Sequence, residues 1–153
     1  MKYLYLIFLI ALYSCVKDSV TLSKTIFTNS TLHQINLVGY KNGIIDQECT
    51  FSLNPNESKS VFVLNNRGIG NGLSFGGYFQ SVDSFVVNFD NMNMISHYKP
   101  NLIGTNTKKY LFYSSRNIFN DSNYLKNITI DRKYRREWDF KYTFVEQDYI
   151  DAR

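Results

Sequence analysis

The segment GLSFG at residues 72–76 has the G-x-S-x-G spacing of the turn that presents a nucleophilic serine in many hydrolases. In such enzymes a histidine takes the proton of the serine hydroxyl, and an acid orients the histidine. Asp83 or Asp90, and then His97, follow Ser74 in the hydrolase order Ser, Asp, His. The motif needs a strand before the serine and a helix after it, whereas Ser74 lies in a glycine-rich stretch ahead of a strand-like run. We therefore expect no catalytic residue and no enzyme, with a hydrolase as the remote alternative.

The same glycine-rich stretch lacks the pattern of a phosphate-binding loop, because Gly68, Gly70 and Gly72 match neither G-x-G-x-x-G nor a P-loop. We expect it to be a flexible connection. The two cysteines and two histidines of the chain are far apart in the sequence and fit no metal-ligand spacing. We therefore expect neither a metal ion nor another cofactor.

Cys15 directly follows an apolar run of twelve residues, Tyr3 to Ser14. A helix of that length spans about 18 Å, well short of the roughly 30 Å hydrocarbon core of a bilayer. With Lys2 ahead of it and polar residues behind it, the run is typical of a secretory signal peptide. We expect residues 1–14 to be this signal peptide rather than a buried strand or helix.

The four residues Leu12–Tyr13–Ser14–Cys15 resemble the lipobox of bacterial lipoproteins. The resemblance implies that the cysteine sulfur is diacylated and that Cys15 becomes the new N-terminus after cleavage. Leu12 and Ser14 fit the pattern, and Tyr13 is bulkier than the usual small residue. One acyl chain binds a membrane weakly, whereas two or three anchor a protein stably. We expect a membrane anchor on Cys15; the alternative is an ordinary secretory signal with an incidental cysteine.

The remaining residues are sufficient for one domain with a sizeable core, because 139 of the 153 residues are left after removal of residues 1–14. We assign residues 15–20 to the lipidated cysteine and a short tether, and residues 21–153 to a single domain. Tyrosine and phenylalanine are abundant, with 12 of each, as is typical of β proteins. Loss of Lys2 lowers the formal charge from +4 to +3, and this modest excess indicates no particular partner.

Short apolar runs alternate with turn signals along this domain, which favours an antiparallel β-sandwich or open barrel. The Asn42–Gly43 dipeptide predicts a type I′ hairpin turn, and Pro55 marks a second turn. The pattern in residues 100–133 indicates secondary structure less clearly. There we expect one short helix near residues 120–127 and a strand at 127–130. The other expected strands are residues 20–27, 32–41, 44–53, 59–64, 81–91, 93–98 and 137–152.

Alternation within these runs predicts which side chains face the core. Val87 lies between Phe85 and Phe89 on the apolar face of its run. His33 shares strand parity with Ile35 and Leu37, which favours a partly buried strand residue, and His97 is expected to end a strand.

Cys49 shares a face with Ile45, Phe51 and Leu53, so we expect a small buried hydrophobic residue rather than a cysteine that pairs with another molecule. In the last run, Trp138, Phe140, Tyr142 and Phe144 alternate with polar residues.

A basic segment precedes the last strand. Basic and aromatic side chains interleaved in this way can bind nucleic acid, but an exported, lipid-anchored protein seldom meets it. We expect a solvated surface balanced by neighbouring acids, with anionic lipid or glycan headgroups as the alternative. The basic residues are Arg132, Lys133, Arg135 and Arg136, the aromatic ones Tyr134 and Trp138, and the acids Asp131, Glu137 and Asp139.

Four further segments and the lipobox form a shared pattern: NSTLHQINLVGYKNG at 29–43, LNPNES at 53–58, VDSFVVNFDN at 82–91 and YTFVEQDYIDA at 142–152. Together they resemble small lipoproteins of the Bacteroidota. The resemblance covers the chain in scattered pieces and implies an architecture and a location, with no activity attached.

The residues after Cys15 are consistent with that location. Val16 stands where enterobacterial lipoproteins retained in the inner membrane have aspartate. Residues 16–19 are similar to tethers that send Bacteroidota lipoproteins to the cell surface, and Ser19 lies in a segment similar to an O-glycosylation acceptor of that phylum. A plain flexible linker is the alternative for both. We expect the outer membrane, on its periplasmic or cell-surface side.

Two functional classes remain. The first is a non-enzymatic scaffold or accessory subunit that binds another protein. The second is a glycan- or ligand-binding module that stacks on exposed aromatic rings, for which Phe75, Tyr78, Phe79 and Trp138 are candidates. Burial of Phe79 and Trp138 would favour the protein-binding class.

Lipidation is tested at Cys15. Radiolabelled palmitate should enter the wild-type protein and not the Cys15→Ser variant, and globomycin should cause the precursor to accumulate. Label that persists in Cys15→Ser would refute the lipid anchor.

Overall fold

The computed structural model of the 153-residue chain describes residues 20–65, 79, 81–102 and 104–153. Cys15, Ser19, Ser74, Phe75 and Tyr78 lie outside them. The strands are β1 (Val20–Asn29), β2 (Ile35–Lys41), β3 (Ile44–Leu53), β4 (Ser58–Asn65), β5 (Ser84–Phe89), β6 (Asn93–Tyr98), β7 (Lys109–Tyr110), β8 (Leu125–Arg132) and β9 (Arg135–Phe144); the helical segments are η1 (Asp121–Asn123) and α2 (Glu146–Ala152).

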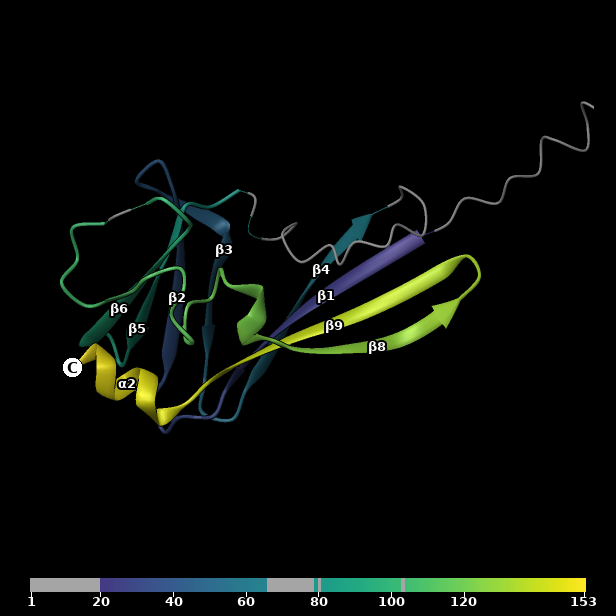
Figure 1. The fold of residues 1–153 in the computed structure, drawn as a ribbon. Coiled ribbons are helices and arrows are strands. Elements are labelled where there is room, and N and C mark those ends of the chain that lie inside the picture. The colour runs from purple at the N-terminus through teal and green to yellow at the C-terminus, as the bar shows by residue number, and fades with distance from the viewer. Residues whose placement is uncertain (1–19, 66–78, 80, 103) are drawn as a thin grey trace, which may run out of the picture.

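The strands form two packed sheets, which confirms the expected all-β sandwich (Figure 1). Sheet A has the strand order β4-β1-β9-β8, and sheet B has the order β3-β2-β5-β6-β7. Both sheets are mixed rather than wholly antiparallel, because β1 pairs with β9 and β6 pairs with β7 in parallel. Strands β1, β8 and β9 extend well beyond sheet B, and we call this projecting part of sheet A the arm (Figure 1).

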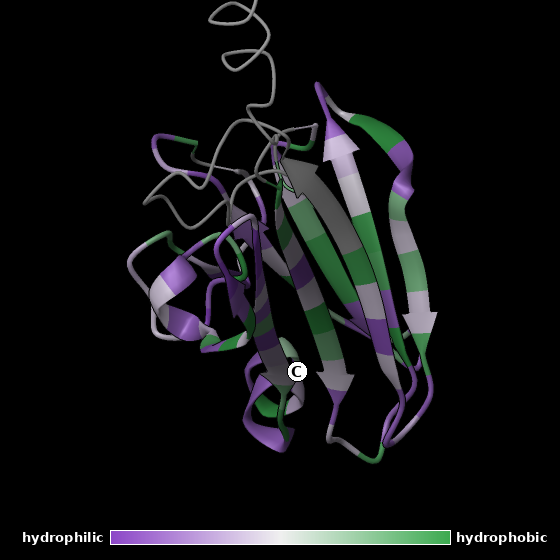
Figure 2. Cartoon of the chain, turned by 90° about the vertical axis from the view of Figure 1, so that its right-hand side faces the viewer, coloured by the Kyte–Doolittle hydropathy of each residue, from purple (hydrophilic) through white to green (hydrophobic). Residues whose placement is uncertain are grey.

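The expected alternation holds in β5 and β9. Phe85, Val87 and Phe89 are fully buried, and the residues between them are half-buried on the other face of the sheet. Hydrophobic and hydrophilic residues also alternate along the strands that face the viewer in Figure 2. In β9, Phe140 and Tyr142 are buried in the same core.

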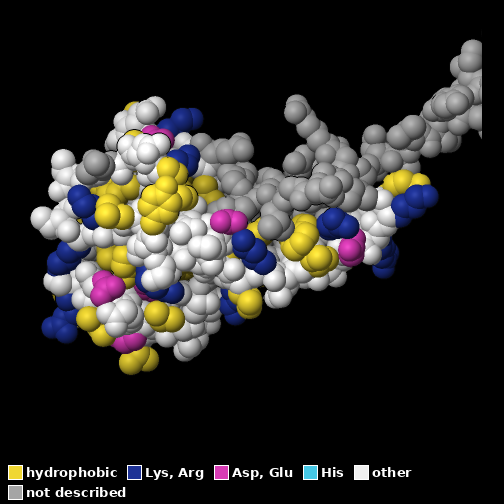
Figure 3. All heavy atoms as spheres, in the orientation of Figure 1, with side chains coloured by type: hydrophobic (Ala, Val, Ile, Leu, Met, Phe, Trp, Pro, Cys, Tyr) yellow, Lys and Arg dark blue, Asp and Glu magenta, His cyan; other side chains and the backbone are white. Residues whose placement is uncertain are grey.

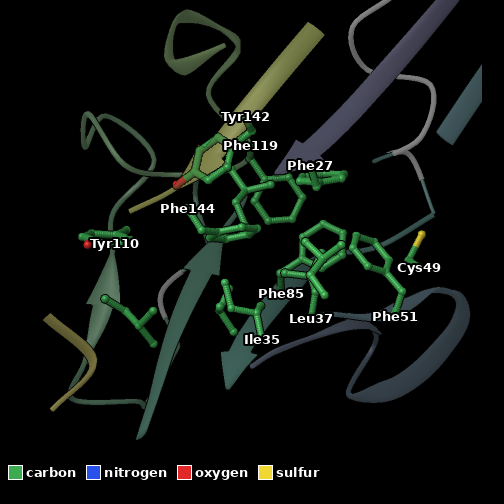
Figure 4. Packing of buried hydrophobic residues seen from close by; sticks show 14 of the residues in the cluster. Phe27, Ile35, Leu37, Cys49, Phe51, Phe85, Tyr110, Phe119, Tyr142 and Phe144 are labelled. Carbon is green, nitrogen blue, oxygen red and sulfur yellow. The ribbon is translucent and has the colours of Figure 1, made fainter. Parts of the chain in front are cut away.

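Phe27 joins the two sheets (Figure 4). Its ring centroid lies 5.4 Å from that of Phe51 in sheet B, and 6.4 Å from those of Tyr142 and Phe144 in sheet A. Edge-to-face and tilted aromatic pairs at such distances add to the stability that apolar burial provides. The core is therefore a cluster of aromatic rings centred on β1.

Both expected turns are present. Asn42 and Gly43 have φ angles of 50° and 78°, as a type I′ turn requires. At the second turn the amide of Glu57 donates to the carbonyl oxygen of Asn54, 3.0 Å away, with Pro55 between them.

The face expected for β3 is correct only at its second half. Phe51 and Leu53 are buried and so is Cys49, but Ile45 is 46% exposed. The pairing of β2 with β3 has a register shift between Leu37 and Gly39. The alternation of buried and exposed residues in β3 therefore differs before and after this shift. Gly39 lies at this shift, and a Cβ atom there would come within 2.7 Å of the Cβ of Cys49.

Three further expectations differ from the structure. The last run is not one strand, because β9 ends at Phe144 and α2 begins at Glu146. His33 lies in the loop before β2 rather than on a strand. Val20, which falls in both the expected tether (15–20) and the expected strand (20–27), belongs to β1. The short helix expected near residues 120–127 is the single turn η1, and the strand expected at 127–130 lies within β8.

The two faces of β5 give a matched stability test. Val87→Asp places an unpaired carboxylate in the core and should lower the free energy of unfolding by about 3–5 kcal/mol. Asn88→Asp, on the outer face, should change it by less than about 1 kcal/mol. Urea denaturation of both variants measures the difference, and equal destabilisation would contradict the strand parity.

Candidate functional site

The histidine of the hydrolase-like pattern is locked in the core. His97 is 1% exposed, and its Nδ1 accepts the amide hydrogen of Ile118 at 3.1 Å. Burial, followed by the charge of Arg116, lowers the pKa of His97 to about 3. A general base must reach its substrate and take up a proton near neutral pH. His97 meets neither condition, so it serves the packing of the fold.

The two aspartates of the same pattern, Asp83 and Asp90, form hydrogen bonds with residues of nearby turns and loops, and neither is bonded to His97. An Asp83 carboxylate oxygen accepts the Asn42 amide at 2.7 Å. Asp90 accepts the Gln34 amide at 2.9 Å and lies 2.5 Å from Nδ1 of His33. The hydrogen bond from His33 lowers the pKa of Asp90. Among the described residues, therefore, these three candidates form no catalytic arrangement.

His33 also contacts the C-terminal helix. Its Nε2 lies 3.3 Å from Oε1 of Glu146, and its ring stacks on Tyr149 with centroids 3.6 Å apart. A second cluster, missed in the sequence, holds the same helix: Arg116 pairs with the buried Asp148, which also accepts from the Tyr110 hydroxyl at 3.2 Å. Both clusters attach α2 to the sandwich, which is a structural role.

The outer face of sheet B, by contrast, forms a concave surface. Strand pairing arranges its residues in three cross-strand rows over β2, β5 and β6, and all of them except the buried Ser96 are half-buried or exposed. Adjacent strands lie about 4.8 Å apart, so the side chains of one row contact each other or flank a slot. The rows are Tyr40, Ser84 and Tyr98; Val38, Val86 and Ser96; and Asn36, Asn88 and Met94.

A groove of about 480 Å³ follows the central strand of this face. It is hollow because β5 contributes only the short side chains of Ser84, Val86 and Asn88, while the larger Tyr40 and Tyr98 lie on either side. The groove lining carries no charged side chain: Gly43, Met94, Thr105 and Asn106 complete it. Its chemistry is that of hydroxyl, amide and apolar groups.

One wall of the groove is held by the loop after β6. A Cβ atom on Gly104 would lie 1.9 Å from the Tyr98 ring, so only glycine lets the loop lie against that ring. The Asn106 side-chain amide donates to the Ser96 hydroxyl at 2.5 Å, and Lys109 donates to the Gly104 carbonyl oxygen at 2.9 Å. Tyr98 is therefore a positioned wall rather than a freely rotating side chain.

The opposite wall is held by the start of β5. The amide of Asp83 donates to the carbonyl oxygen of Tyr40 at 2.7 Å, while the Asp83 carboxylate accepts from Asn42. The charge of Asp83 is thus directed at the backbone of the β2–β3 turn. Both walls are preformed, which lowers the entropy cost of binding.

Two smaller depressions and several exposed apolar side chains adjoin the groove. A depression of about 190 Å³ shares Ser84 and Tyr98 with the groove and reaches Leu102; another, of about 290 Å³, lies at the β2–β3 turn by Ile44 and Ile45. The exposed fraction is 74% for Ile44, 51% for Met94 and 43% for Leu102. We call the groove with these neighbours the groove face.

Neither described candidate for aromatic stacking forms an exposed platform. Phe79 is 3% exposed and packs edge-on against Phe27 and Phe85. Trp138 is half-buried against the core. Sequence analysis did not identify Tyr40 and Tyr98 as groove residues, because their alignment depends on which strands pair. The short side chains on the outer face of β5 were the one sequence feature that could have indicated a groove.

Two of the four basic residues of the basic segment, Arg135 and Arg136, pair with acids of the same segment. Arg136 lies 2.9 Å from Asp131, and Nε of Arg135 donates to Glu137 at 2.6 Å. Asp139 pairs with Lys24 of β1 at 3.0 Å.

The burial of His97 generates a pH prediction. Its pKa of about 3 in the folded protein lies below the ordinary 6.5, so protons favour the unfolded chain as pH falls from about 6.5. His97→Asn retains an acceptor for Ile118 but cannot titrate. Between pH 7 and pH 5 the wild type should lose about 1–2 kcal/mol more stability than His97→Asn, measured by urea denaturation. An equal loss in both proteins would show that His97 is protonated inside the fold.

Within the described residues, no three His, Cys, Asp or Glu side chains are grouped so as to hold a metal ion. In the same part of the chain, none of the helices has the length and apolar character needed to cross a bilayer. Comparisons with protein-family models, curated proteins and solved structures find no match to this chain.

Proposed function

We propose that the protein is an exported lipoprotein that is anchored by lipid on Cys15 and binds another protein through the groove face, without covalent chemistry. The observation that carries the proposal is the preformed, uncharged groove with apolar side chains around it. The proposed location is the bacterial outer membrane, on its periplasmic or cell-surface side.

The composition of the groove face supports a protein partner. Protein interfaces are depleted of charge at their centre and enriched in tyrosine and methionine. Tyr40, Tyr98 and Met94 meet that description, and Asp83, which lines one adjoining depression, is already bonded to backbone. Three adjoining depressions suit several side chains of a partner better than one small ligand.

Clusters of exposed apolar side chains support the same reading. On the face drawn in Figure 3, hydrophobic side chains gather at the end of the molecule that carries β5, β6 and α2, with basic and acidic groups interspersed. Exposed apolar groups rimmed by polar ones are typical of protein interaction sites.

A glycan is the alternative occupant, because Tyr40 and Tyr98 offer ring faces and the lining offers hydroxyl and amide groups. The apolar rim at Ile44, Ile45 and Leu102 favours protein, since these side chains would find no apolar partner on a neutral sugar chain.

The point where the described chain begins, Val20, and the groove face lie at opposite ends of the molecule. The amide of Val20 donates to the carbonyl oxygen of Tyr134 at 2.9 Å, so the chain enters the sandwich at the tip of the arm, away from sheet B (Figure 1). A lipid on Cys15 would hold the tip near the membrane and leave the groove face open to a partner.

Capture from intact cells tests the proposal. Full-length protein, crosslinked on cells and purified, should retain one stoichiometric protein partner. Val86→Arg places a long charged side chain in the groove and should reduce recovery at least tenfold, because the charge would be desolvated in the complex. Thr129→Arg adds the same side chain at an exposed position of β8 and should leave recovery unchanged.

Enrichment of polysaccharide in place of a protein would select the glycan alternative. Equal recovery with Val86→Arg and Thr129→Arg would remove the groove from the proposal. Turnover of an ester, peptide or glycoside substrate that Ser74→Ala abolishes would contradict the absence of catalysis.

A further inference from the structure

The tip of the arm is a second surface with its own chemistry. It is the β8–β9 turn with the adjoining strand ends, residues 131–137, which carry four basic and two acidic side chains. The two acids are engaged, because Asp131 pairs with Arg136 and Glu137 with Arg135. Arg132 and Lys133 are exposed and have no acidic partner among the described residues. The tip therefore has a local charge excess of +2 that faces solvent.

An aromatic side chain lies within this basic tip. Tyr134 is 39% exposed, and Nζ of Lys133 lies 5.2 Å from the centroid of its ring. Tyrosine is enriched where proteins meet the headgroup region of a bilayer, because its ring is apolar and its hydroxyl polar. Lysine and arginine near an anionic lipid surface gain electrostatic energy that salt weakens.

The short segment between Cys15 and the first described residue, Val20, limits how far the tip can lie from the membrane. The amide of Val20 is bonded to Tyr134 at the tip, and only four residues separate Val20 from Cys15. Five Cα–Cα steps span at most roughly 17 Å when fully extended. A cysteine whose acyl chains are inserted in the bilayer therefore keeps the tip within about two Debye lengths of the headgroups at physiological salt.

We propose that this tip is a membrane-contact surface that binds anionic phospholipid headgroups through Arg132 and Lys133, with Tyr134 at the headgroup level. The inference rests on the proposed lipid anchor on Cys15, and it adds an orientation: the arm stands on the membrane, and the groove face points away from it. Glycan headgroups, nucleic acid and a protein partner are the other occupants that a basic tip could take.

Brominated lipids test the contact, because they quench tryptophan only at short range. The sensor is Tyr134→Trp in full-length lipidated protein with Trp138→Phe, which removes the native tryptophan. The matched control is Tyr113→Trp in the same background, since Tyr113 is 89% exposed and lies in the loop after β7. Near-UV circular dichroism verifies that each variant is folded.

In liposomes containing phosphatidylglycerol, Tyr134→Trp should be quenched at least twofold more than in phosphatidylcholine alone, and 1 M salt should remove the difference. Lys133→Glu should remove it as well, while Lys141→Glu, the same charge change at an exposed position in the middle of β9, should preserve it. Tyr113→Trp should show no lipid-dependent quenching.

Each of the other outcomes would refute one part of the proposal: the tip contact, the lipid anchor or the identity of the occupant. Equal quenching in both lipids, equal quenching at Tyr113→Trp, or no effect of Lys133→Glu would refute the tip contact while the anchor stands. Protein that fails to float with either liposome would refute the lipid anchor itself. Quenching that is displaced by added polysaccharide, DNA or a protein would assign the tip to that occupant instead.

Discussion

The structure depends on the burial of Phe27 between the two sheets. Its strand, β1, pairs in parallel with β9 and places Phe27 beside Tyr142 in the register, while the ring itself reaches Phe51 of sheet B. Loss of this ring would leave a cavity, because the interior is close-packed and the ring is fully buried. The same strand that closes the core continues past sheet B and forms the arm. One aromatic residue thus couples the sandwich to the strand that begins at the tip of the arm.

The two faces of sheet B differ because its central strand, β5, has large apolar side chains on one side and short side chains on the other. The inner side of β5 contributes Phe85, Val87 and Phe89 to the core, and their packing fixes the position of the strand. The outer side supplies only short side chains and becomes the floor of the groove. Rigid strands position binding groups more accurately than loops do. The loop that does contribute, after β6, is fixed by the close approach of Gly104 to Tyr98.

The sequence predicted those features of the fold that depend on residues close together in the chain. The alternation at Val87, the Asn42–Gly43 turn and the burial of Cys49 are properties of neighbours in the chain, and the structure confirms them. The parallel pairing of β1 with β9 joins residues more than a hundred positions apart, and no periodicity reports such a partner.

The same limit hid most of the site. The row of Tyr40, Ser84 and Tyr98 exists only once three strands are in register. Helix α2 was missed because its short sequence continues the alternation of β9, whereas its place is determined by tertiary contacts such as the pair of Arg116 with Asp148.

The most direct test of the groove face as a docking surface is methionine oxidation on intact cells compared with the purified protein. Met94 lies in the groove lining and is 51% exposed, while Met92, 75% exposed, lies two residues earlier in the β5–β6 turn outside that lining. Mass spectrometry reads sulfoxide at both positions in one peptide. Met94 should be protected severalfold on cells, and Met92 should oxidise equally in both samples. Equal oxidation of Met94 in both samples, or protection of Met92 alone, would contradict docking at the groove face.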